Sequence, residues 1–188
     1  MVMLKKYELT EQHPDTGLWR IKALRDFGNV AKGDIGGWIE GEKNLSHEGD
    51  AWVSGDAWVY GDARVYGYAR VFGDARVFGN AWVSGDARVS GDAEVYGNAW
   101  VSGNAEVFGD ARVSRAKHTS NVWTMTLGKH TITVDGDYLN IGCESHTIKQ
   151  WLKNFRKIGE MEGYSPEEIE RYGDAITMIN KWLKADGS

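Results

Sequence analysis

Residues 51–114 read AWVSGD AWVYGD ARVYGY ARVFGD ARVFGN AWVSGD ARVSGD AEVYGN AWVSGN AEVFGD ARVS. One phrase, Ala-x-Val-x-Gly-(Asp/Asn), therefore recurs every six residues without interruption. A small residue, an inward β-branched residue and a Gly-Asx turn at this period are typical of a hexapeptide β-helix, in which each hexad forms a short strand and a corner. We expect a mainly β protein built on a parallel β-helix. Its inward valines are Val53, Val59, Val65, Val71, Val77, Val83, Val89, Val95, Val101, Val107 and Val113.

The segment before the repeat predicts a β cap. Residues 7–9 and 18–24 alternate apolar with polar residues around the turn at 13–17, which indicates a hairpin. Such a hairpin would cover the first coil, whose edge and core are otherwise open. Irregular spacing indicates small insertions at Gly36-Gly37 and around His47 where the coil begins. The earlier inward positions are Val30, Ile39 and Leu45.

The segment after the repeat predicts strands and then a helical hairpin. Residues 122–127 and 130–141 resemble strands joined at tight-turn sequences, and residues 117–121 form a polar linker. Thr147 with Gln150 predicts a capping box, and Ser165 before Pro166 predicts a second helix start. The apolar faces are Ile148, Trp151, Leu152, Phe155 and Ile158, then Ile169, Tyr172, Ile176, Ile179 and Leu183. We expect the two helices to pair, either on the β-helix or against another subunit.

Four segments follow from this pattern. They are an N-terminal β-hairpin cap over residues 1–29, a β-helix over 30–116, a β-hairpin region over 117–142 and a two-helix tail over 143–188.

Composition excludes several function classes. The formal charge is −5, and the five arginines of the repeat lie among six Asp and two Glu residues, so general nucleic-acid binding is not expected. Cys143 is the only cysteine, which excludes an intramolecular disulfide and favours a reducing compartment. No signal-peptide or membrane-spanning pattern occurs. We expect a soluble, cytoplasmic protein that needs no cofactor and does not bind membranes.

The hexads resemble the left-handed β-helix (hexapeptide-repeat) superfamily. The runs Ile21–Phe27, Gly36–Ile39, Leu45-Ser46 and Gly49–Val53 resemble, more narrowly, the YdcK-type group, whose members are labelled acetyltransferase-like. Similar short proteins with a strand-plus-helix tail are frequent in phage genomes. The resemblance implies a left-handed coil of three hexads and a homotrimer, and it points to a phage origin.

If eighteen residues form one coil, the variable outward positions stack in columns about 4.8 Å apart. Eleven aromatic residues then project from a repeat whose interior is filled by Ala and Val. Burial in a homotrimer is one explanation, and a groove in which Arg and aromatic side chains bind a planar, phosphate-bearing ligand is another. The ligand- or partner-binding candidates are Trp52, Arg70 and Arg88; Trp58 and Arg76; Arg64, Trp82 and Trp100; and Tyr66 and Tyr68.

One corner of the coil carries a column of carboxylates. Stacked carboxylates could hold Ca²⁺, or each Asp could cap its own turn beside a neighbouring Arg, which the Gly-Asp sequence favours. The column comprises Asp56, Asp74, Asp92 and Asp110.

An acyltransferase would need a histidine base beside an acyl-CoA cleft. All five histidines lie outside the regular hexads, and His47, in the insertion before Val53, is the one weak candidate. His118 lies in the polar linker. Cys143 and His146 could pair as nucleophile and base or help to hold a metal, although a packed cysteine at a strand end is the simpler explanation.

We therefore expect a phage-encoded, non-enzymatic homotrimeric binding module that recognises a host protein or a nucleotide-like signalling ligand and has an anti-defence role. An acyltransferase that uses acyl-CoA and a structural or virion scaffold are the alternatives.

Overall fold

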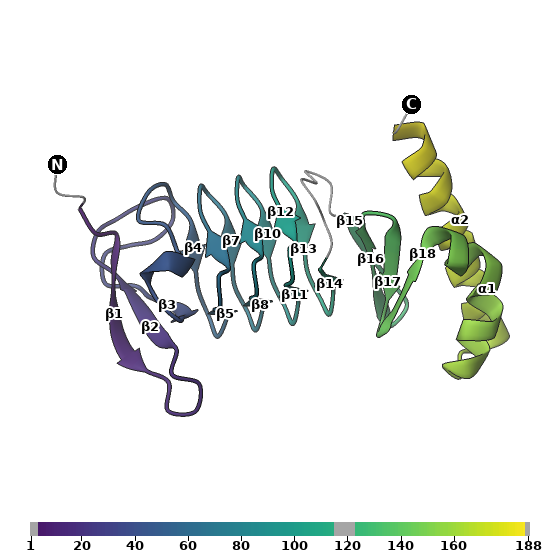
Figure 1. Ribbon diagram of the computed structural model, residues 1–188, viewed down its shortest axis with the longest axis horizontal. Helices are drawn as coiled ribbons and strands as arrows, with labels where there is room; N and C mark the ends of the chain where they lie inside the picture. Colours follow the sequence, from purple (N-terminus) through teal and green to yellow (C-terminus); the bar gives the residue numbers. More distant parts are fainter. Residues whose placement is uncertain (1–3, 115–122, 187–188) are drawn as a thin grey trace.

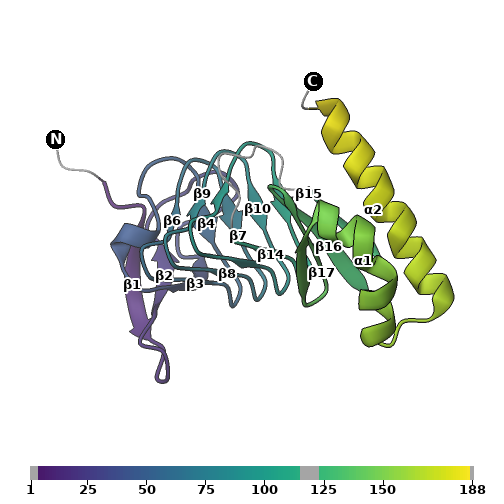
Figure 2. The ribbon, with the colours of Figure 1, turned by 45° about the vertical axis from the view of Figure 1, so that its right-hand side comes forward.

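The structure is a computed structural model that describes residues 4–114 and 123–186. The chain forms a rod of stacked coils, closed at one end by a β-hairpin and at the other by a small antiparallel sheet that two helices cover (Figure 1). The turned view in Figure 2 shows the same order of parts along the rod. The expected mainly β fold with parallel coils and a helical tail is therefore confirmed.

The hexads form two-residue strands that pair with the strands one coil away. Val71 stacks on Val53 and Val89 on Val71, so the coil repeats every eighteen residues. Three parallel sheets result, which we name the first, second and third face. The first face contains β4 (Trp52–Val53), β7 (Arg70–Val71), β10 (Arg88–Val89) and β13 (Glu106–Val107). The second contains β3 (Ile35–Ile39), β5 (Trp58–Val59), β8 (Arg76–Val77), β11 (Glu94–Val95) and β14 (Arg112–Val113); the third contains β6 (Arg64–Val65), β9 (Trp82–Val83) and β12 (Trp100–Val101).

The repeated Ala and Val side chains fill the interior. Each Ala and Val of the hexads is at most 3% exposed. At each corner the glycine adopts a positive φ, for example 66° at Gly85, where an added Cβ would lie 2.8 Å from the Gly103 backbone nitrogen. Glycine at the corner therefore permits both the turn and the close stacking of coils.

The predicted N-terminal hairpin is confirmed. Strands β1 (Tyr7–Gln12) and β2 (Trp19–Ala23) are antiparallel, and β2 pairs with β3. Tyr7 and Ile21 are fully buried and belong to the same core as the hexad valines. The hairpin therefore closes the first coil.

The start of the coil contains one of the two predicted insertions. Ile39 stacks on Val59 and Leu45 on Val65, a spacing of twenty residues, so two extra residues lie near His47, after the 3₁₀ turn η1 (Glu42–Asn44). The insertion predicted at Gly36-Gly37 is wrong, because both glycines lie inside β3. A Cβ on Gly36 would lie 2.4 Å from Ile21 Cγ1, so this strand needs glycine to approach its neighbours.

A four-stranded antiparallel sheet closes the other end. Its strands are β15 (Trp123–Leu127), β16 (His130–Asp135), β17 (Tyr138–Ile141) and β18 (Glu144–Thr147). The sequence did not predict β18, which lies in the part expected to be helical tail. The sheet contacts the last coil through polar groups: Asp135 accepts a hydrogen bond from the Ser114 backbone N–H at 2.9 Å, and Asn140 Nδ2 donates to the Arg112 carbonyl at 2.6 Å.

The helices are α1 (Ile148–Met161) and α2 (Pro166–Asp186), and both predicted capping boxes are present. They pair and pack on the antiparallel sheet, where the Trp151 indole N–H donates to the Leu139 carbonyl at 2.7 Å. The helices therefore pack on this sheet, and the expected packing on the β-helix is wrong. Leu152 was expected on the buried face, but it is 37% exposed because it lines an open hollow beside the β16–β17 turn.

The left-handed winding and the four segment boundaries stay predictions. The boundary at 116/117 and His118 lie outside the described residues. Along the described ranges, no helix combines the length and the apolar character that crossing a bilayer requires.

Candidate binding site

The outward columns predicted from the eighteen-residue period are present. Arg70 lies in register between Trp52 and Arg88 on the first face. On the second face Arg76 lies between Trp58 and Glu94, and on the third face Trp82 lies between Arg64 and Trp100. The columns themselves could therefore be derived from the sequence.

Most arginines of these columns are neutralised or stacked by the neighbour one coil away. Arg112 Nε lies 3.4 Å from Glu94 Oε2, and Arg88 Nη1 lies 3.6 Å from Glu106 Oε1. The guanidinium of Arg76 lies 5.2 Å from the Trp58 ring, and that of Arg64 lies 5.6 Å from the Trp82 ring.

Arg70 and Arg88 form the exception. They are the one pair of like charges in register among the described strands of the three faces. Arg88 forms an ion pair with Glu106, whereas Arg70 has no ion pair or hydrogen bond with any described residue. Like charges opposite each other in neighbouring strands are destabilising. Arg70 is therefore the arginine of this pair that has no close ion pair, although the Asp50 carboxylate and the Arg70 guanidinium both lie near Gly28.

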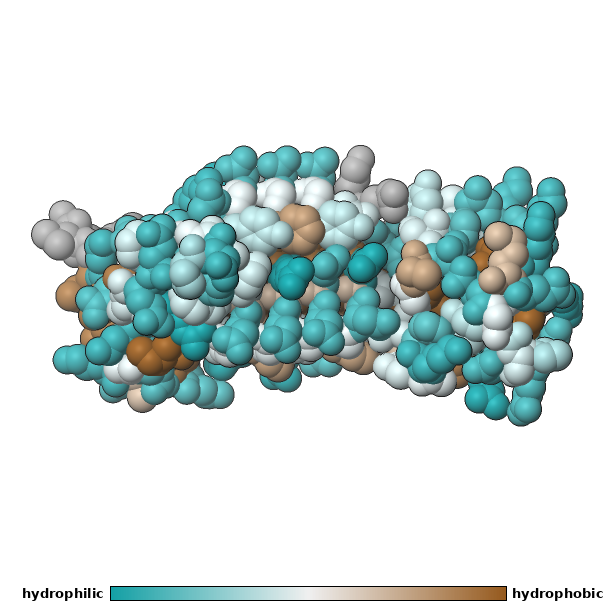
Figure 3. All heavy atoms as spheres, turned by 90° about the horizontal axis from the view of Figure 1, so that it is seen from below, coloured by the Kyte–Doolittle hydropathy of each residue, from teal (hydrophilic) through white to brown (hydrophobic). Residues whose placement is uncertain are grey.

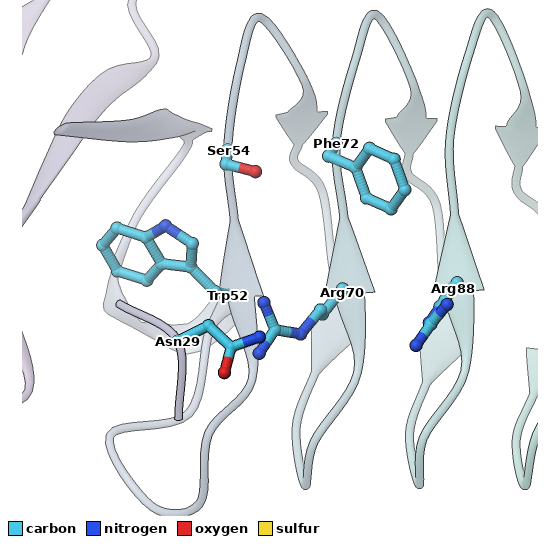
Figure 4. Close-up of a pocket in the computed structure, with 6 residues that line it drawn as sticks. All are labelled: Asn29, Trp52, Ser54, Arg70, Phe72 and Arg88. Atoms are coloured by element: carbon cyan, nitrogen blue, oxygen red, sulfur yellow. The ribbon is translucent and has the colours of Figure 1, made fainter. Parts of the chain in front are cut away.

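A hollow of about 350 Å³ lies over this arginine pair. In Figure 4 the Arg70 side chain runs toward Asn29 and Trp52, while Phe72 and Arg88 project from the same and the next coil. The hollow combines two cations, an aromatic face and small polar groups. Its lining residues are Asn29, Trp52, Ser54, Arg70, Phe72 and Arg88.

Sequence reasoning predicted the wrong exposure for Trp52 and missed part of the lining of the hollow. Trp52 was expected on the exposed surface, but it is 5% exposed because Phe27 covers it at 5.3 Å between ring centroids. Phe72, which is 39% exposed, appears in the outward columns but was not among the candidates. Asn29 comes from the segment before the coils, so no signal in the repeat indicated it.

The third face carries a second hollow, of about 440 Å³, beside Arg64, Tyr66 and Trp82. The Trp82 and Trp100 rings lie 5.2 Å apart, and Trp100 Nε1 donates to Ser84 Oγ at 3.4 Å. Its one lysine, Lys43, forms an ion pair with Asp62 at 3.3 Å. This hollow therefore also has one cation with an ion pair and one, Arg64, without, but Arg64 stacks on Trp82, whereas the unpaired arginine of the first face lies beside another arginine. Tyr68 lies apart, 58% exposed on the corner between the third and first faces.

The second face carries an aromatic ladder. Tyr60, Phe78 and Tyr96 stack with ring centroids 5.1 and 5.2 Å apart and nearly parallel planes. The stacking leaves all three side chains half-buried, and burial raises the pKa of Tyr60. Figure 3 shows a lengthwise band of pale and brown side chains between two hydrophilic rows on the side that it views. Much of the expected exposed aromatic surface is thus covered by other rings of the same chain.

The corner carboxylates do not converge on a metal. Within the described residues no group of three or more His, Cys, Asp or Glu side chains has the arrangement of a metal site. One of the weak Ca²⁺ candidates, Asp56, instead forms an ion pair with Arg20 at 3.3 Å. The candidates were Asp56, Asp74, Asp92 and Asp110.

His47 has a structural environment. Its Nδ1 accepts a hydrogen bond from the Lys6 backbone N–H at 3.2 Å, and its ring stacks on Tyr7 at 4.3 Å. Its Nε2 lies 3.7 Å from a Glu42 carboxylate oxygen. Burial lowers the pKa of His47, although the Glu42 carboxylate opposes this change. The imidazole thus joins the N-terminal cap to the first coil.

Cys143 and His146 have separate partners. Cys143 is exposed, so the expected packing of its side chain is wrong, and its Sγ lies 3.9 Å from Glu162. His146 Nε2 lies 2.6 Å from a Glu144 carboxylate oxygen. The imidazole is therefore oriented by a carboxylate and not by the thiol.

The comparison with known families concerns the coils that form the first-face hollow. The family model for the YdcK beta solenoid repeat matches residues 69–85 and 87–103, each nearly one coil. These ranges include Arg70, Phe72 and Arg88. No curated protein matches the chain. The chain is a β-solenoid protein, and two of its coils are similar to the YdcK beta solenoid repeat.

Proposed function

We propose that the chain is a non-enzymatic binding module that works as a homotrimer and binds a nucleotide-like anion in the first-face hollow. The observation that carries this proposal is the Arg70–Arg88 pair, which is side by side in register where the other described arginine columns alternate with Glu or Trp.

An anion would relieve the repulsion within this pair. Of the two guanidinium groups, only that of Arg88 has an ion pair with a described residue, with Glu106 at 3.6 Å. A phosphate has several acceptor oxygens that match the fork of a guanidinium group, and it could contact both arginines.

The rest of the hollow favours a ligand with a planar ring. The exposed face of Phe72 offers a stacking surface, and base–aromatic stacking is worth about 1–3 kcal/mol. The Asn29 amide and the Ser54 hydroxyl could bind ring or sugar polar groups. A volume of about 350 Å³ lies in the usual range of small-molecule sites.

The lining of the first-face hollow comes from one chain, so each subunit of a homotrimer would carry its own site. If the protein is phage-encoded, binding of a signalling nucleotide would remove that signal from a host defence system. A host protein is the other class of factor that such a surface could recognise.

The test is a thermal-shift screen with inorganic phosphate, nucleoside monophosphates and cyclic dinucleotides. At a ligand concentration of about 100 Kd, binding stabilises the folded state by about 2.7 kcal/mol, so a clear rise in Tm is expected for at least one nucleotide. Arg70→Gln should abolish this rise in Tm because it removes the guanidinium group of the pair that has no ion pair.

Arg76→Gln is the matched control, since Arg76 stacks on Trp58 on the second face and should leave the shift intact. A screen in which no nucleotide raises Tm would contradict the small-molecule proposal and favour a host protein. Equal loss in both variants would show that the first-face hollow is not the site.

A further inference from the structure

The helical tail carries a second surface, which is apolar at its base and basic at its rim. A hollow of about 740 Å³ lies between the start of α1 and the end of α2. Ile148, Leu152 and Leu183 form its apolar base, and Lys149 and Lys184 stand at its edge. The hollow is separate from the first-face site, which lies on the coils.

The charge of this surface is opposite to that of the chain. Residues 148–159 of α1 and 175–184 of α2 contain six Lys or Arg residues and no Asp or Glu, although the chain carries −5. Arg156 forms an ion pair with Glu170 at 2.8 Å. The remaining five have no ion pair with a described residue; they are Lys149, Lys153, Lys157, Lys181 and Lys184. Of these, Lys149 and Lys184 line the hollow, whereas Lys157 lines a separate hollow beside His146 and Glu162.

Apolar side chains remain accessible on the same end of the helix pair. Leu152 is 37% exposed, Trp182 38% and Met178 49%. An exposed apolar patch with a polar rim is typical of an interaction site. We propose that this groove docks an acidic amphipathic helix of a partner protein, with its apolar side chains against Leu152 and Leu183 and its carboxylates over the lysines.

Shape and charge distinguish this occupant from the other anionic surfaces. A nucleic-acid backbone needs dispersed cations and makes no use of an apolar hollow. A bilayer is flat and would leave the hollow unfilled, whereas an amphipathic helix inserts its apolar side chains into such a groove. Asp137, the one acidic residue of the lining, stands at the β-turn side, so partner carboxylates would lie on the helix side.

A second copy of the chain does not match the groove. Its acidic corner column, Asp56 to Asp110, alternates with Gly and Ala and offers no large apolar side chain. The partner is therefore expected to be a different protein.

The experiment uses the full chain and a fluorescein-labelled synthetic helix of sixteen residues with Leu at positions i, i+3, i+4 and i+7 and Glu between them. Fluorescence anisotropy should show binding that weakens with salt. The double variant Lys149→Glu/Lys184→Glu and the single variant Leu152→Asp should each lower the affinity at least tenfold. Lys32→Glu, a charge reversal at the other end of the rod, should leave it unchanged, as should Arg70→Gln.

Circular dichroism establishes that each variant keeps its helices. Four outcomes would overturn the proposal: equal peptide affinity in all variants, equal binding of a peptide with Lys in place of Glu, tighter binding of single-stranded DNA or of phosphatidylglycerol vesicles than of the acidic peptide, or a change in oligomeric state in Leu152→Asp.

Discussion

At the scale of single residues, buried polar side chains replace the coil that is missing at each end of the solenoid. Lys6 is fully buried at the N-terminal end, where its Nζ donates to the Ala51 carbonyl at 2.7 Å and lies 3.4 Å from that of Gly49. The Tyr7 hydroxyl donates to the Leu45 carbonyl at 2.7 Å. An inner coil would satisfy such carbonyls with backbone N–H groups.

The buried amine predicts a pH dependence of stability. Burial, with repulsion from Arg25, lowers the pKa of Lys6 from 10.5 to about 8. The unfolded chain thus binds the proton more tightly, and between pH 8 and 10.5 unfolding takes up a proton. The free energy of unfolding should therefore rise with pH in this window, on the order of 1 kcal/mol per pH unit, and stay flat below it.

Urea unfolding at pH 7.0, 8.0, 8.75 and 9.5 would measure this dependence. Lys6→Met keeps the length of the side chain but cannot titrate, so its free energy of unfolding should lack the rise. Identical slopes in the two proteins would show that Lys6 is protonated to the same extent in the folded and unfolded states.

The burial of Trp52 shows what single-residue reasoning cannot supply. Strand alternation correctly places Trp52 outward. Its 5% exposure depends on Phe27, which lies outside the repeat and reaches the first coil only through the fold of the N-terminal segment. The repeat in the sequence determines whether a side chain points inward or outward. It does not determine whether a residue from another segment covers that side chain.

At the scale of elements, the hexad predicted the positions and the register of the strands, because each inward Val stacks on the Val eighteen residues away in the next coil. Strand β18 could not be predicted, since its sequence, Glu-Ser-His-Thr, has no apolar alternation. Its position follows from the turn at Gly142, which has a φ of 57°, and from the pairing of Leu139 with His146. Partner strands therefore determine this element more than its own residues do.

The contact between the last coil and the antiparallel sheet predicts a specific loss of stability. Asp135 is buried and accepts the Ser114 N–H, so Asp135→Ala leaves a buried donor without this partner. Such a loss costs about 1–3 kcal/mol. Thermal unfolding should show a lower Tm, and hydrogen exchange at the Ser114 amide should become faster.

Asp137→Ala is the matched control, because Asp137 is an exposed residue of the adjoining turn. It should change neither measurement appreciably. Unchanged exchange at Ser114 in Asp135→Ala would mean that this hydrogen bond does not hold the sheet on the coil.

At the scale of the whole molecule, the three corners differ in charge, which bears on how a homotrimer would assemble. The corner between the first and second faces carries Asp56, Asp74, Asp92 and Asp110. In a threefold assembly the corner nearest the axis meets its own copies, so a column of carboxylates there would repel itself. In the regular coils the corner between the second and third faces carries one carboxylate, Asp62, which Lys43 neutralises at 3.3 Å. The coil before it adds Glu40, which accepts the Gly61 N–H at 2.7 Å, and Glu42, which forms an ion pair with Lys5 at 2.6 Å.

That corner is the best candidate for the threefold axis. Its other residues are Asn80 and Asn98, and Asn80 Nδ2 donates to Asn98 Oδ1 at 3.2 Å. It also joins the aromatic ladder of the second face to Trp82 and Trp100 of the third face. This arrangement would bury mainly uncharged and aromatic surface of the second and third faces near the axis, and the first face, which lies opposite this corner, would remain on the outside of the trimer.

The prediction is a trimer of about 63 kDa, three copies of the 21.0-kDa chain, in native mass spectrometry. Asn80→Asp/Asn98→Asp would place six carboxylates around the axis and should dissociate the trimer into folded monomers, with unchanged circular dichroism. Asp92→Asn, at the corner that faces away from the axis, should leave the trimer intact. A monomeric wild-type protein would exclude the trimer altogether. A trimer that survives the double variant would place another corner at the axis, and the first-face hollow would then have different neighbours.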